Sequence, residues 1–248
     1  MDIAKLADGD TIHINSSIFY GAAYGNLWND HHRDWKNQHV IWAHAEKLLS
    51  QPGASQQDRE LAVIQLQRAV EHRDKLLDEV YGFEQIPGKK GRNKYDIMTD
   101  LAIIRPNLKK PLRDLRNSLV HQITASPLSA DQCALLSDAA WYYIKVTDHI
   151  ARQSAEEIVV EHTLGAKSAA SLSLTVKKRD WIVNVNDGHT HPDFLQEHAA
   201  PDSLTVRMTK CEFVKYDGVL RFQGAVTGSL LALGRVIQIF FEESDLGY

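Results

Sequence analysis

Four polar side chains of the types used in phosphodiester chemistry lie close together in the segment PLRDLRNSLVHQI, residues 111–123. On a helix with about 100° between successive residues and Arg116 at zero, Arg113 lies at about 60°, Asn117 at about 100° and His121 at about 140°. The apolar residues fall in a separate arc of about 80°. They are Leu112, Leu115, Leu119 and Ile123. The spacing therefore predicts two guanidinium groups, an amide and an imidazole on one flank of a helix whose other side packs into a core.

These side chains suit the cleavage of RNA without a metal ion. Arginine offers a fixed positive fork for a phosphate and for the charge that develops as the phosphorus becomes five-coordinate. Histidine titrates near neutrality, so it can take a proton from a ribose 2'-hydroxyl or give one to the leaving oxygen. Asparagine can orient the imidazole or the phosphate. The ordinary alternative is an exposed helix face on which Arg and His have no catalytic role.

The charge of the chain is distributed in a way that favours an RNA partner near this helix. The whole chain has a net charge of -4, which argues against a protein that coats nucleic acid with its entire surface. Residues 85–116, however, contain nine basic and three acidic side chains, a net charge of +6. A basic stretch attracts the RNA backbone, although most such runs are only solvated surface. Charge and helix position alone predict four RNA-binding residues, which are Arg105, Lys109, Lys110 and Arg113.

The run LRNSLVHQ, with Arg116, Asn117 and His121, resembles the R-N-x-x-x-H signature of the HEPN superfamily. The similarity extends over roughly residues 35–160. It implies a domain of four or five helices that forms a homodimer in which two motif helices face each other. It also implies that Arg116 stabilises the phosphate, that His121 is the general acid and base, and that Asn117 positions both. Many members are endoribonucleases that need no metal ion and no cofactor.

The resulting hypothesis is a metal-independent endoribonuclease with a bacterial stress, defence or toxin–antitoxin role, in which an antitoxin or regulatory protein is a further partner. One alternative is a non-catalytic HEPN module that binds nucleotides, RNA or a protein, in which Arg116 and His121 only organise a dimer interface. A helical protein unrelated to this superfamily is the third interpretation.

The elements that must position these residues form two regions with different hydrophobic periods. Up to about residue 165 the apolar residues have helical spacing, with helices expected at 35–50, 55–80, 95–104, 111–125 and 129–150. Only Arg73 interrupts the apolar stripe of the second helix. Ser55 with Asp58, and Ser129 with Gln132, have the spacing of capping boxes. From residue 166 apolar and polar residues alternate, and 235–241 reads as a last strand. We therefore expect an α+β protein in which an α-helical, HEPN-like bundle (1–165) is followed by a small antiparallel β domain of five or six strands (166–248).

The composition limits the other classes of function. The two cysteines, Cys133 and Cys211, belong to no disulfide framework or ligand array, which favours a reducing compartment. No window approaches the ~20 apolar residues of a membrane span, and the first residues do not resemble a signal peptide, so a cytoplasmic location is expected. The segment DGHTHPDFLQEH contains three histidines and three acids, but a polar loop gathers such residues by chance, and no metal site is expected.

Overall fold

In the computed structural model, six of the seven described α-helices lie in one unit, and the seventh lies in the unit that holds the sheet. The structure describes residues 3–28, 35–121, 127–152, 154–164, 168–177, 179–227 and 230–245. Within these ranges, the side chains of residues 26–28, 109, 115–121, 154, 156 and 242–245 are outside the description. The chain divides into two units. The sheet unit combines Met1–Trp28, Glu84–Lys90 and Ala155–Tyr248, and the helical unit combines Asn29–Phe83 and Gly91–Ser154.

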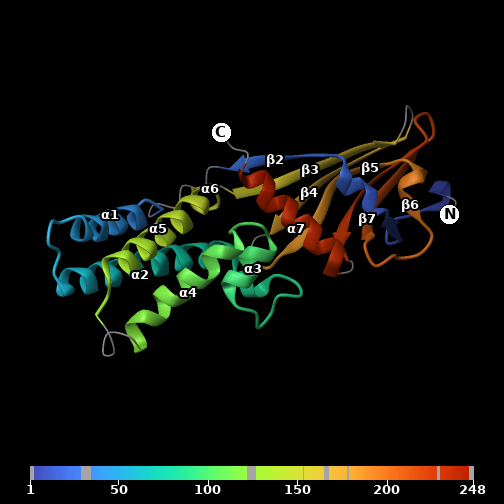
Figure 1. Cartoon of the computed structure of the whole chain (residues 1–248). Coiled ribbons are helices and arrows are strands. Elements are labelled where there is room, and N and C mark those ends of the chain that lie inside the picture. Colours follow the sequence, from blue (N-terminus) through green and yellow to red (C-terminus); the bar gives the residue numbers. More distant parts are fainter. Residues whose placement is uncertain are drawn as a thin grey trace. The chain divides into compact units, whose positions relative to one another are not determined.

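The helical unit is built around three helices that pack against one another, α1 (Asn37–Leu49), α2 (Gln56–Tyr81) and α5 (Ala130–Val146) (Figure 1). The serine caps predicted for the two longest helices are confirmed. Ser55 and Asp58 form a capping box at the start of α2, and Ser129 and Gln132 form one at the start of α5. Each box satisfies backbone N–H groups that a helix N-terminus leaves without a partner, which fixes where both helices begin.

Three further helices complete this unit, namely α3 (Lys94–Asp100), α4 (Pro106–His121) and the short α6 (Asp148–Arg152). The helix predicted from Pro111 begins five residues earlier, at Pro106. Proline suits the first position of a helix because the N–H group that it lacks has no helical partner there. Pro111 consequently lies inside α4, where its missing N–H deprives the Asn107 carbonyl of the usual i+4 donor.

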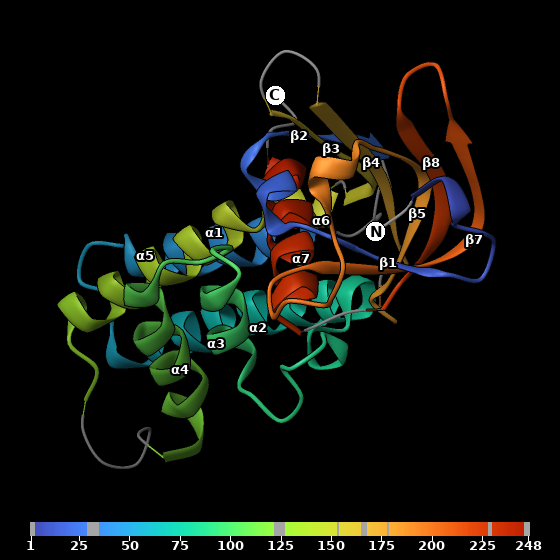
Figure 2. The ribbon, with the colours of Figure 1, turned by 90° about the vertical axis from the view of Figure 1, so that its right-hand side faces the viewer.

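The sheet unit contains an eight-stranded sheet whose strand order is β2-β3-β4-β5-β8-β7-β1-β6. Pairing is antiparallel wherever a register is defined between described residues. The strands are β1 (Thr11–Ile14), β2 (Ala22–Trp28), β3 (Ser154–Leu164), β4 (Ser168–Lys177), β5 (Ile182–Thr190), β6 (Leu195–Gln196), β7 (Leu204–Val214) and β8 (Val219–Val226). The final helix, α7 (Leu230–Asp245), lies along this curled sheet (Figure 2).

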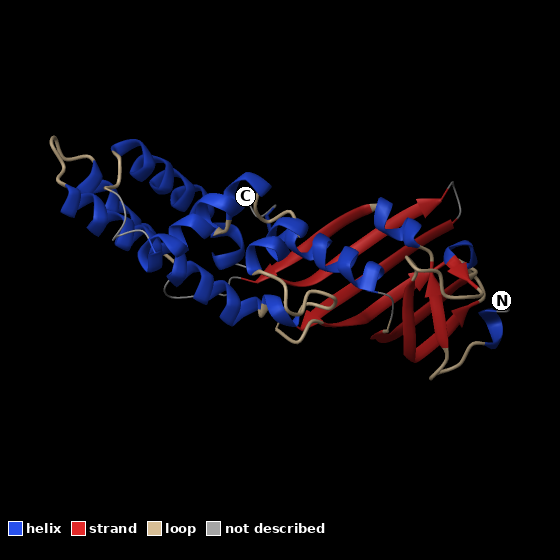
Figure 3. Cartoon of the chain, turned by 60° about the horizontal axis from the view of Figure 1, so that its bottom comes forward, coloured by secondary structure: helices blue, strands red, loops and turns tan. Residues whose placement is uncertain are grey.

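The expected fold class, a HEPN-like bundle followed by a small β domain, is therefore wrong. The protein is α+β, but its sheet is large, and its strands come from residues before and after the helical segments in the sequence. Figure 3 shows these strands gathered in one sheet. Residues 235–241 are part of α7 and not a strand. Five of these residues are buried, namely Val236, Ile237, Ile239, Phe240 and Phe241, and the pairs 236/240 and 237/241 have the spacing of one helical turn. A short apolar run does not distinguish a buried strand from a buried helix, and this explains the error.

The two faces of the sheet differ in character. On β4, Leu172, Leu174 and Val176 are buried, whereas the alternating residues Ser171, Ser173 and Thr175 are polar and more exposed. Buried side chains of α7 cover Trp181, whose ring centroid lies 5.8 Å from that of Phe240 and 5.7 Å from that of Phe241. The sheet therefore has an apolar core face and a polar face that is open to ligands.

No helix within the described ranges combines the length and the apolar composition that a membrane crossing requires.

Candidate functional site

All three signature residues, Arg116, Asn117 and His121, belong to the last turns of α4. Their side chains, and that of Lys109, lie outside the part of the chain that the structure describes. The preceding turns of α4 are described and show how the helix is oriented in its unit. Leu112 is completely buried, and α4 packs against α5 and α2. Leu112 therefore lies in the core, as expected for the apolar side of this helix.

The other side of α4 is basic and open to solvent. Lys110 and Arg113 are exposed, and Arg105 is exposed directly before the helix begins. By helical periodicity, Lys110 lies at about 120° and Arg113 at about 60° from Arg116, so the backbone positions 117 and 121 continue the same strip of the helix. Four cationic or polar positions thus follow one another along one side of α4. This arrangement can place a polyanion beside an imidazole-bearing helix.

The +6 stretch is divided between the two units of the chain. Lys89 and Lys90 belong to the sheet unit, whereas the remaining seven basic residues of the stretch belong to the helical unit. Arg92 forms an ion pair with Asp100, and the Lys94 ammonium lies 4.0 Å from the carboxylate of Asp74. Of the nine basic residues of the stretch, two therefore belong to another unit than α4, and two more have an acidic neighbour within the helical unit.

A buried polar network supports the helices that hold α4. Arg73 of α2 is completely buried, and its guanidinium donates hydrogen bonds to the carbonyl oxygens of Trp35 and Thr147, each at 3.1 Å. The same guanidinium lies 2.8 Å from the Asp148 carboxylate at the start of α6. The His39 imidazole of α1 lies 2.9 Å from that carboxylate. One ion pair therefore ties α1, α2 and the α5–α6 junction together. Burial lowers the pKa of Arg73, and Asp148 opposes this shift.

A half-buried carboxylate, Asp74, lies one residue further along α2. Asp74 accepts hydrogen bonds from the hydroxyls of Tyr143, on α5, and Tyr95, on α3. Burial and the neighbouring carboxylate raise the pKa of Tyr143 well above its ordinary value, so its hydroxyl stays protonated as a donor. Through this hydrogen bond to Asp74, Tyr143 connects α5 to α2. These bonds explain why polar residues interrupt an apolar helix face.

The histidine-rich segment does not assemble a metal site in the described residues. His189 pairs with Asp187 at 3.0 Å, and His191 pairs with Asp193 at 3.1 Å. Among the side chains that the structure describes, no group of three or more His, Cys, Asp or Glu residues is arranged to hold a metal ion. The thiols are also unsuited to nucleophilic chemistry, because burial raises the pKa of both Cys133 and Cys211.

Comparison of this chain with models of protein families, with curated proteins and with solved structures finds no match.

Proposed function

We propose that the helical unit is a metal-independent endoribonuclease whose site is formed by α4. The observation that carries this proposal is the exposed pair Lys110 and Arg113, which lies on the same side of α4 as the positions of Asn117 and His121, with the exposed Arg105 directly before the helix. Leu112 anchors the opposite side of the helix in the core. A fixed helix with one polycationic side provides the attraction and the alignment that an RNA backbone requires.

The reaction is an internal transfer of the phosphate. The ribose 2'-oxygen attacks the adjacent phosphorus as a base removes its proton, and the bond between phosphorus and the 5'-oxygen breaks. The leaving oxygen takes up a proton, so the products are a 2',3'-cyclic phosphate and a 5'-hydroxyl. His121 handles these protons, Arg116 stabilises the charge on the phosphoryl oxygens, and Asn117 positions them. Two copies of α4 facing each other in a homodimer bring together one histidine for each proton transfer.

The decisive experiment measures cleavage of a mixed RNA by the full chain in the presence of EDTA. Arg116→Ala and His121→Ala are compared with Lys75→Ala, which removes an exposed charge of α2 rather than of α4. We expect cleavage by the wild type and by Lys75→Ala, and a loss of at least about 100-fold in the two signature variants. Sedimentation at matched concentration shows whether each variant keeps the same oligomeric state. Absence of cleavage by the wild type, or equal cleavage by His121→Ala, would show that the nuclease assignment is wrong.

The RNA-binding role of the strip is tested separately. Lys110→Ala and Arg113→Ala are expected to weaken RNA binding for all sequences alike. Each substitution should also reduce the dependence of log affinity on log salt by about 0.7, because one phosphate contact is lost on a single strand. A salt dependence equal to that of the wild type would remove these residues from the interface. Expression of the wild type beside His121→Ala then tests whether a toxin-like arrest of growth depends on the site.

A further inference from the structure

Strand β8 lies between two strands that each carry a β-bulge at the same level of the sheet. On one side, Val185 of β5 pairs with Gly224, but the next defined pair is Gly188 with Phe222, so β5 contains one extra residue. On the other side, Met208 of β7 pairs with Gly224 and Lys210 with Gln223, so β7 also contains one extra residue. Bulges redirect side chains and are over-represented next to binding sites. Here two bulges lie on either side of β8, both next to Gly224.

Two glycines make this architecture sterically feasible. A Cβ on Gly224 would lie 2.4 Å from the carbonyl oxygen of Arg207, and a Cβ on Gly188 would lie 2.5 Å from the ring of Phe222. Non-bonded contacts of a Cβ atom are essentially never this short. The β7 backbone and the Phe222 ring therefore reach their positions only because Gly224 and Gly188 lack a side chain.

The bulge of β7 is also held by the N-terminal turn. The N–H of Gly9 donates to the carbonyl of Met208, and the N–H of Met208 donates to the carbonyl of Asp10, both at 2.9 Å. The N–H of Cys211 donates to the Asp8 carboxylate at 2.8 Å. Backbone groups on both sides of the extra residue therefore have fixed partners. The bulge is a defined part of the fold and not a frayed strand.

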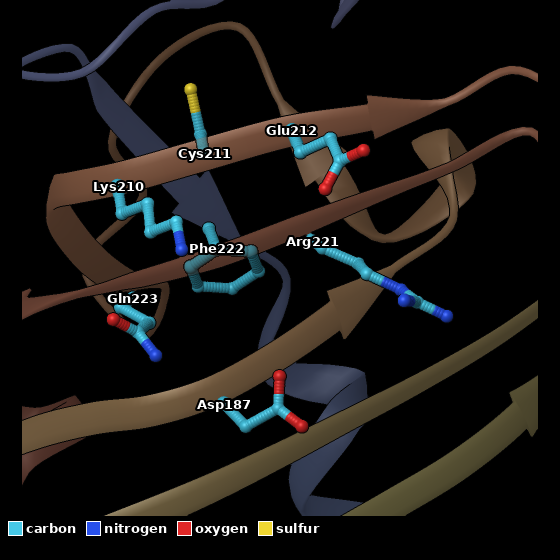
Figure 4. Close-up of a pocket in the computed structure, with 7 residues that line it drawn as sticks. All are labelled: Asp187, Lys210, Cys211, Glu212, Arg221, Phe222 and Gln223. Carbon is cyan, nitrogen blue, oxygen red and sulfur yellow. The ribbon is translucent and has the colours of Figure 1, made fainter.

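Two adjoining hollows open on the polar face of the sheet at these bulges. The smaller, of about 140 Å³, is lined by Asp187, Lys210, Glu212, Arg221 and Gln223 together with Cys211 and Phe222 (Figure 4). The larger, of about 380 Å³, is lined by Asn184, Asn186, Thr209 and again Gln223, together with Val185, Gly224 and Ala225. Gln223 therefore joins the two hollows. In Figure 4 the side chains of Lys210, Gln223 and Asp187 come from three neighbouring strands and border the same space.

The chemistry of the lining indicates what the hollows can bind. Two carboxylates and two cations balance each other, which disfavours a phosphate or a polyanion. Lys210, Glu212, Arg221 and Gln223 have no side-chain hydrogen bond or ion pair with any described residue, so their donors and acceptors are available to a ligand. Asn186 is held by the Thr175 hydroxyl at 3.1 Å, and Asp187 by His189 at 3.0 Å. The lining thus combines polar groups that already have a hydrogen-bond partner with donors and acceptors that a ligand can use.

We propose that the paired hollows at the two bulges bind a neutral sugar. A hydroxyl group both donates and accepts hydrogen bonds, so vicinal hydroxyls can bind to the carboxylates and cations of the smaller hollow and to the amides of the larger one. The only aromatic ring of the lining, Phe222, is buried against Gly188 and does not offer a face for a nucleobase. The open shape of the hollows and their exposed polar groups indicate weak affinity, with a Kd of roughly 1 mM.

The test is saturation-transfer NMR on the full chain with glucose, galactose, mannose, N-acetylglucosamine, maltose and cellobiose. Inorganic phosphate and adenosine are the comparison ligands. Gln223→Ala is the informative variant, since its side chain lines both hollows and is exposed. Thr163→Ala is the matched control, because Thr163 is an exposed residue of β3 outside both hollows. Asn184→Ala provides a second variant, and circular dichroism verifies that each protein is folded.

We expect at least one of these sugars to bind, a loss of about tenfold or more in affinity for Gln223→Ala, and no change for Thr163→Ala. The proposal is overturned if none of the six sugars binds. It is also overturned if phosphate or adenosine binds more tightly than every sugar, or if Gln223→Ala and Asn184→Ala bind as the wild type does. Because cleavage of RNA is not part of this measurement, its outcome is independent of the function proposed for α4.

Discussion

The buried guanidinium of Arg73 gives the most direct test of how the helical unit is held together. Its side chain is completely buried and reaches three elements at once, through the carbonyls of Trp35 and Thr147 and the carboxylate of Asp148. We consider the substitution Arg73→Met, which keeps an apolar stem of similar length but removes the charge and all of these donors. The Asp148 carboxylate, whose side chain is only 16% exposed, then loses its closest cation.

The cost follows from what remains after the substitution. Breaking a buried ion pair by removing one partner costs about 3–5 kcal/mol. Asp148 keeps His39 at 2.9 Å and the Lys145 ammonium at 3.9 Å, which reduces the penalty. The Thr147 carbonyl still accepts the N–H of Ala151 at 3.0 Å, so the main further loss is the bond to the Trp35 carbonyl, which adds about 1 kcal/mol. We therefore expect the free energy of unfolding to fall by about 3–4 kcal/mol.

Urea denaturation is the assay, followed by tryptophan fluorescence and by circular dichroism so that separate unfolding of the two units is detected. Lys75→Met is the control, because Lys75 and Glu79 form an exposed ion pair on the same helix and its loss should cost less than about 0.5 kcal/mol. The double variant Arg73→Met/Asp148→Leu should recover part of the stability, since no unpaired charge remains. A loss below about 1 kcal/mol in Arg73→Met would refute the reasoning, because it would mean that Asp148 is adequately solvated or paired without Arg73.

Two further predictions concern Tyr143 and Gly224. Because the pKa of Tyr143 is raised in the folded chain, its hydroxyl keeps a proton that the unfolded chain loses above about pH 10, so stability should fall as the pH rises through that range. Tyr143→Phe should flatten this alkaline decline in urea titrations, whereas the exposed Tyr142→Phe should not, and equal slopes would contradict the assignment. Gly224→Ala places a methyl group against the backbone of β7 and should cost about 1–3 kcal/mol or more, measured as a lower Tm. Gly234→Ala, which has open space around its Cβ position on α7, should keep or raise the Tm, and a similar loss in both variants would count against a steric cause.

The helices were predictable where local signals are strong, and the sheet was predictable only in part. Ser55 and Ser129 mark the starts of α2 and α5 because a capping box is a local contact over three residues. The alternating segments that became β4, β5, β7 and β8 were also visible. By contrast, β1 has only four residues and pairs with β7 near Arg207, almost two hundred positions away. Such pairing has no local signature, so the large sheet was read as a small one.

The same distinction applies to the candidate site. The sequence shows Arg73 as an interruption of an apolar stripe, but its partner Asp148 lies 75 positions away and is identified only by the fold. The sequence also shows the basic residues before Arg116, but not that Lys89 and Lys90 belong to the other unit. Gln223 had no distinguishing feature at all, because its role follows from bulges on two neighbouring strands. The sequence therefore shows which residue types could act in a site. It does not show which distant residues the fold brings together.

The two proposals concern different units and are tested by different substitutions. Together, their outcomes show whether α4 and the hollows bind the same molecule or two separate ligands. Arg116 and His121 belong to α4, whereas Gln223 belongs to β8. If a sugar binds and RNA is cleaved, the effect of Gln223→Ala on cleavage becomes the informative measurement. A lower rate at subsaturating RNA with the same kcat would mean that Gln223 contributes to RNA binding, which would count against hollows that take neutral sugars alone. A rate equal to that of the wild type would mean that the chain combines a nuclease with an independent sugar-binding sheet.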